Sequence, residues 1–194
     1  MTVDFDFSWS RFLWVVFIFV GVPTAIGAAV IRSSWRAERA NLTTSISRPT
    51  GTGRLGLWTT GLLAFVLGFL SCAGWLSWSA DSNGDVRGPA LPAPTKFPTW
   101  QVVACGVTVV LVCLVAAHLS RWAVSGGLAA AAGTAAGFTT AFAVAASVGV
   151  TSQEGIGVAF SELGWGIGLV VLMAVRGAWL TGRHNRAAAG PPSW

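Results

Sequence analysis

Charged residues are scarce in this sequence. Asp, Glu, Lys and Arg together make up 10% of the 194 residues, whereas apolar residues make up 54%. Soluble domains average about 25% charged residues, so water would solvate a globule with so few charges poorly. The composition excludes an ordinary soluble domain and predicts an integral membrane protein.

Cysteine is also rare, and its three residues form no metal or redox motif. Cys72, Cys105 and Cys113 lie in apolar stretches, without a C-x-x-C pair or a neighbouring histidine cluster. We expect them to be small buried apolar residues. Clustered acids and Ser-His pairs are absent from the apolar runs as well. The sequence therefore predicts no catalytic residue, no cofactor and no metal site.

Tyrosine is absent, whereas tryptophan occurs eleven times. Most of these tryptophans lie near the ends of apolar runs, and only Trp165 lies well inside one. Amphipathic rings at such positions are typical of the boundary between lipid headgroups and hydrocarbon.

Long apolar runs make up most of the sequence. A helix of roughly 20 apolar residues crosses the hydrocarbon core of a membrane. The runs predict an all-α integral membrane bundle of five transmembrane helices, with four helices as the alternative. Pro23 predicts a kink in the first helix. The expected spans are 12–31, 55–80, 98–120, 125–150 and 155–179, within a single domain at 1–182 that precedes a mobile cytoplasmic tail at 183–194.

The distribution of charges predicts an orientation for these five spans. With the N-terminus outside and the C-terminus in the cytoplasm, nine of the twelve basic residues fall on the cytoplasmic side. This bias follows the positive-inside rule. Those nine residues are Arg32, Arg36, Arg39, Arg48, Arg54, Arg121, Arg176, Arg183 and Arg186.

Small residues recur every four positions in the fourth run, at Ala129, Gly133, Gly137 and Ala141. A helix places such residues along one stripe, which lets two backbones approach closely in lipid. The stripe predicts either packing within this chain's own bundle or a docking face for a larger partner.

The fifth run contains another pair of small residues, Gly164 and Gly168, together with Glu162. Glu162 is the only acidic residue inside an expected span, and ionisable groups within lipid are costly and usually face a cavity or a partner. Two interpretations remain open for Glu162: coupling to an ion or substrate, or a hydrogen bond at the interface or between helices.

Three arginines follow the first run, at Arg32, Arg36 and Arg39. A basic cluster on the cytoplasmic side of a span predicts contact with anionic lipid headgroups. The net charge of +5 is explained by positive-inside topology, so we expect membrane lipids as partners and no nucleic acid.

The N-terminal run from Phe5 to Trp14 (FDFSWSRFLW), followed by Val20-Gly21-Val22-Pro23, resembles small multi-pass membrane proteins of mycobacteria and their relatives. Some of these are placed in a drug/metabolite-transporter-like group, and one resembles an accessory subunit of the Mce lipid importer. The resemblance implies a non-catalytic accessory subunit in the bacterial inner membrane. Such a subunit would stabilise or regulate a lipid or sterol ABC importer by contacting its permease subunits.

Two other functions are kept as alternatives. A small proton-coupled secondary transporter would use Glu162, although the small multidrug-resistance group that this alternative resembles keeps its essential acid in the first span. An accessory subunit of a respiratory or cell-wall complex would share the features of the lipid-importer subunit.

Overall fold

The computed structural model describes residues 9–44, 53–80, 86–87, 97–146 and 154–188. These ranges are almost entirely helical, and five of their helices are long and apolar enough to cross a membrane. The chain is therefore a multi-pass helical membrane protein. Its elements are α1 (Trp9–Val16), η1 (Phe17–Gly21), α2 (Val22–Thr44), α3 (Leu57–Leu76), β1 (Ser79–Ala80), β2 (Val86–Arg87), α4 (Thr99–Leu119), α5 (Ser125–Ala146) and α6 (Glu154–Ala188).

The first span is a continuous rod of α1, η1 and α2. Its π-helical turn, η1, ends just before Pro23, and the Val22 N–H bonds the Phe17 carbonyl oxygen. Pro23 lacks an N–H and its ring crowds the preceding turn, which accounts for an irregularity at the predicted position.

The helix of the first span is longer than the sequence predicted. Residues 32–44 were expected to form the start of an Arg-rich cytoplasmic loop, but they continue α2 as far as Thr44. Arg, Ala and Glu are good helix formers. The helix therefore extends beyond the apolar run that defines the span.

The last helix is also longer than expected. The predicted fifth span ends at residue 179, whereas α6 continues to Ala188 and so includes the start of the region assigned to a mobile tail. Residues 189–194 lie outside the described residues. The segment between α3 and α4 also lies mostly outside the described residues, apart from the short antiparallel pairing of β1 with β2.

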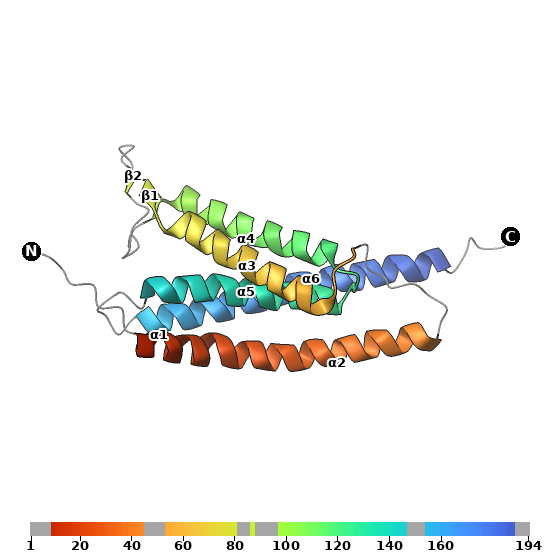
Figure 1. Cartoon of the computed structure of the whole chain (residues 1–194). Coiled ribbons are helices and arrows are strands. Elements are labelled where there is room, and N and C mark those ends of the chain that lie inside the picture. The colour runs from red at the N-terminus through yellow and green to blue at the C-terminus, as the bar shows by residue number, and fades with distance from the viewer. Residues whose placement is uncertain (1–8, 45–52, 81–85, 88–96, 147–153, 189–194) are drawn as a thin grey trace, which may run out of the picture.

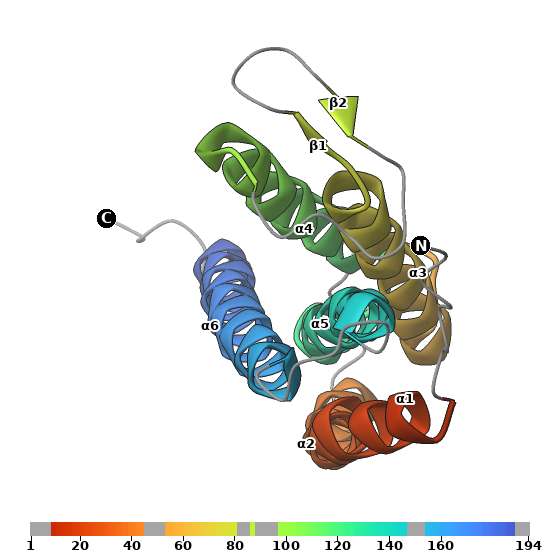
Figure 2. The same ribbon diagram turned by 90° about the vertical axis from the view of Figure 1, so that its left-hand side faces the viewer.

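The helices run lengthwise beside one another, and α5 lies at the centre (Figures 1 and 2). It packs against α2, α3, α4 and α6. In the most apolar stretch of α5, 61% of the residues are buried, compared with 28% in α3 and in α4. The poor apolar content of the fourth run is explained by this central position, because helix contacts replace most of its lipid contacts.

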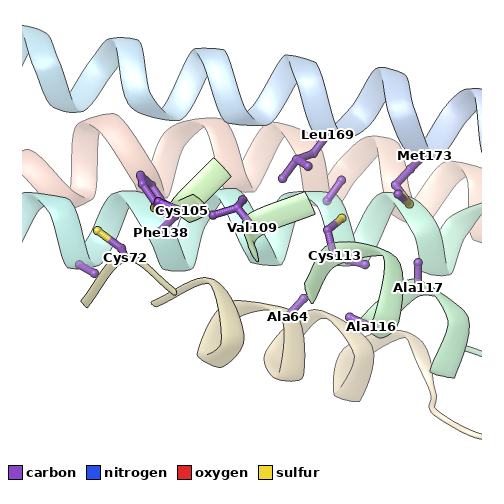
Figure 3. Close-up of a cluster of buried hydrophobic side chains, with 13 residues drawn as sticks. Ala64, Cys72, Cys105, Val109, Cys113, Ala116, Ala117, Phe138, Leu169 and Met173 are labelled. Atoms are coloured by element: carbon purple, nitrogen blue, oxygen red, sulfur yellow. The ribbon is translucent and has the colours of Figure 1, made fainter. Parts of the chain in front are cut away.

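The bundle core consists mainly of small and medium-sized side chains from α3, α4, α5 and α6 (Figure 3). All three cysteines belong to this core, and their thiols are free and buried. The prediction that they are small buried apolar residues is confirmed.

Candidate functional site

The small residues of α5 lie against α3. A Cβ atom added at Gly133 would overlap the Gly61 carbonyl oxygen, and one added at Gly137 would overlap that of Phe65. Ala129 lies near Gly61, and Ala141 is buried. The predicted stripe thus occupies a contact in which the two backbones approach each other closely.

The small residues of α6 have a different environment. Gly164 and Gly168 are exposed, and among the described residues no atom lies within 4 Å of a Cβ built at either position. Large apolar side chains flank them on the same exposed surface, which we call the α6 glycine face. Its members are Phe160, Leu163, Gly164, Ile167, Gly168 and Val171.

Glu162 lies on the opposite, inward side of α6. Its exposed fraction is 6%, and Thr139 of α5, which is fully buried, adjoins its carboxyl group. Neither the Oε2 atom of Glu162 nor the Thr139 hydroxyl oxygen has a hydrogen-bond partner of ordinary geometry among the described residues. The two helices therefore bring together two buried oxygen atoms, Glu162 Oε2 and the Thr139 hydroxyl oxygen, that lack such a partner.

An aromatic pair lies next to this polar site along both helices, since Phe138 precedes Thr139 and Trp165 follows Glu162 by three residues. The ring centroids of Phe138 on α5 and Trp165 on α6 lie 5.5 Å apart. Trp165 also lies close to Gly106 of α4. Trp165 therefore fills space between three helices. This packing role explains why it lies well inside a span and not at headgroup depth.

A second acidic residue, Glu38 on α2, binds the N-terminus of α5. Its carboxylate oxygens accept hydrogen bonds from the backbone N–H groups of Ala123 (3.0 Å), Val124 (3.4 Å) and Ser125 (3.2 Å), and from the Ser125 hydroxyl group (2.7 Å). The first N–H groups of a helix have no partner within the helix, and the helix dipole favours a negative charge there.

Sequence patterns alone do not identify Glu38 as a site residue. The available signal was a single acid among arginines, between Arg36 and Arg39. Nothing in the local sequence connects that acid with Ser125, which is 87 residues away. Only the packing of α2 beside α5 brings the carboxylate to the helix terminus.

The three predicted lipid-contacting arginines lie on one exposed face of α2. Arg32, Arg36 and Arg39 are exposed and spaced by four and three residues, so they follow one side of the helix. The guanidinium carbon of Arg39 lies 5.4 Å from the ring centroid of Trp35, which packs edge-on against Trp122 at 6.1 Å. The C-terminal half of α2, which carries these arginines and Glu38, lies at the opposite end of the bundle from the first turns of α6, which carry Glu162 (Figure 1).

Groups of three or more His, Cys, Asp or Glu side chains that could hold a metal ion are not found within the described ranges. A scan against protein-family models and searches of curated proteins and of solved structures find no match to the chain.

Proposed function

We propose that this chain is a non-catalytic accessory subunit of a larger complex in a bacterial inner membrane. The N-terminal resemblance points to a lipid or sterol importer of the Mce type, with its permease subunits as the direct partners. Five apolar helices, of which α5 is already enclosed by its neighbours, support a role as a preformed helical unit that docks onto other membrane subunits.

The α6 glycine face is the observation that carries the proposal. Gly164 and Gly168 lie in open space between large exposed apolar side chains. In lipid, helices associate through close packing at small residues, since apolar burial gives them little advantage there. On α5 the same kind of stripe is filled by α3, whereas the α6 stripe is left for a helix of another subunit.

Affinity purification in a mild detergent from the native host tests this proposal. The tagged wild-type chain should recover larger membrane subunits in a fixed stoichiometry, and Gly168→Leu should lose them because the new side chain blocks close approach. Gly27→Leu on α2 is the matched control, since Gly27 also has no atom of the described residues within 4 Å of an added Cβ. Recovery of the wild-type chain alone would contradict the proposal.

The identity of the recovered subunits separates the possible complexes. Permease and ATPase subunits would support the lipid importer, whereas respiratory or cell-wall enzymes would support the alternative complex.

A second function, a small proton-coupled transporter, is favoured by the buried and unpartnered carboxyl oxygen of Glu162. On this alternative, Glu162→Gln in proteoliposomes should abolish proton-coupled flux, while Arg36→Gln, at an exposed position, should retain it. Unchanged flux in Glu162→Gln would exclude Glu162 from transport.

A further inference from the structure

We infer that Glu162 and Thr139 form a binding site for a single small monovalent cation between α5 and α6. The ligand is a proton or Na⁺, held by the carboxyl group of Glu162, with the Thr139 hydroxyl group as the second oxygen. This inference goes beyond the role of accessory subunit, because it assigns the bundle a ligand of its own.

The side chains of Glu162 and Thr139 are both buried. Glu162 is 6% exposed and Thr139 is 0% exposed. A buried polar group without a hydrogen-bond partner is costly, and a buried unpaired carboxylate is far more so. A bound proton or Na⁺ neutralises the carboxylate and offsets that cost.

The hydroxyl group of Thr139 is available to a ligand. Threonine hydroxyls in helices commonly donate to the carbonyl oxygen one turn earlier, as Thr140 does to Ala136 at 2.7 Å. The Thr139 hydroxyl makes no such bond among the described residues. Its oxygen therefore remains an acceptor and ligand beside the carboxyl group.

The described elements that pack against α6 supply no cationic side chain in place of a bound ion. Neither α5 nor η1, which both pack against α6, contains a titratable residue. On α4 the titratable groups are Cys105, Cys113 and His118, none of which is permanently cationic. Arg176 lies fourteen residues further along α6, about 21 Å from Glu162 along the helix axis.

The ligand class follows from the number of donors. Ca²⁺ takes six to eight oxygen ligands and Mg²⁺ demands a complete octahedron. A single carboxyl group, in a bundle without a cluster of acids among its described residues, carries one negative charge and therefore matches a single positive charge.

Infrared difference spectroscopy on the full chain in phosphatidylcholine vesicles tests the site. One experiment exchanges NaCl for choline chloride at constant pH and ionic strength, and a second exchanges acidic for alkaline buffer. We expect a carboxyl band that responds to at least one exchange and is missing in Glu162→Gln. A response to Na⁺ identifies Na⁺ as the ligand, whereas a response to pH alone identifies the proton.

Thr139→Val tests the second ligand, and Thr140→Val is its matched control. Loss of an oxygen that contacts the carboxyl group and its ligand should shift the titration midpoint by about tenfold in Thr139→Val only. Identical midpoints in both variants and the wild type would remove Thr139 from the site.

A measurement on the wild type alone keeps the inference testable even when a variant does not fold. Carboxyl modification by dicyclohexylcarbodiimide, located by mass spectrometry, should label Glu162 at a rate that Na⁺ or alkaline buffer slows. The inference is overturned if neither Na⁺ nor pH changes the labelling rate and the carboxyl bands. This outcome does not depend on which subunits co-purify, so it is distinguishable from a failure of the proposed function.

Discussion

Glu38 and Glu162 both lie within the helical bundle, and the surroundings of these two acids differ. The Glu38 carboxylate accepts hydrogen bonds from three backbone N–H groups and from one hydroxyl group at the N-terminus of α5. Glu162 has a buried oxygen atom without a partner among the described residues. Glu38 is thus stabilised by the fold itself, whereas Glu162 is left for an ion.

Glu38→Gln should lower the stability of the bundle. The neutral amide loses the attraction to the helix dipole and the charge-assisted hydrogen bonds, so we expect a loss of about 1–3 kcal/mol in the free energy of unfolding. Denaturant titration in detergent, followed by tryptophan fluorescence, measures this loss.

Arg39→Gln, at an exposed position on the same helix, is the control and should change the free energy of unfolding much less. If the two variants were equally stable, the carboxylate would not hold α5 in place.

At the scale of the element, α5 is distinguished by its position. Its sequence is rich in Ala and Gly, so it is a weakly apolar span compared with α4. Close contact with α3 through Gly68, Gly133 and Gly137 compensates for this weakness.

Gly137→Ala should disrupt the contact between α3 and α5, because its Cβ would overlap the Phe65 carbonyl oxygen. We expect a loss of about 2–4 kcal/mol in the free energy of unfolding, which is the range of severe overpacking. Size-exclusion chromatography after stepwise heating in detergent measures it through the fraction of monodisperse protein.

Gly164→Ala is the matched control. Its Cβ enters open space, and alanine favours a helix over glycine by roughly 1 kcal/mol. This variant should therefore be as stable as the wild type or more stable. Equal losses in Gly137→Ala and Gly164→Ala would contradict the assigned packing.

For the whole molecule, an odd number of spans places the two ends of the described chain at opposite ends of the bundle. The helix α1 begins at one end and α6 finishes at the other (Figure 1). The C-terminal part of α2, which carries Arg32, Arg36 and Arg39, lies toward the end at which α6 finishes. The positive-inside rule therefore predicts that this end faces the cytoplasm.

Cysteine accessibility tests that topology. In a background in which Cys72, Cys105 and Cys113 are replaced by alanine, Thr99→Cys should react with a membrane-impermeant maleimide added to intact cells. Ala40→Cys should react only after the membrane is opened. Labelling of both positions from the same side would contradict five spans, and labelling of Ala40→Cys alone would reverse the orientation.

The sequence by itself determined the class of the protein and favoured five spans over four. A helix satisfies its own backbone hydrogen bonds, so a long uncharged run is sufficient to predict a span in lipid. The irregularity at Pro23 and the burial of the three cysteines were predictable for the same local reasons. Helix ends were less predictable, because α2 and α6 continue through residues that are polar yet favour helices.

Only the tertiary structure decided which residues meet between helices. Periodicity placed Gly133 and Gly164 in equivalent stripes, but α3 fills the first and leaves the second open. The contact of Glu38 with α5 and that of Thr139 with Glu162 depend on the rotation of each helix about its axis. That rotation is set by side-chain packing between segments far apart in the chain. Local sequence patterns contain no information about this packing.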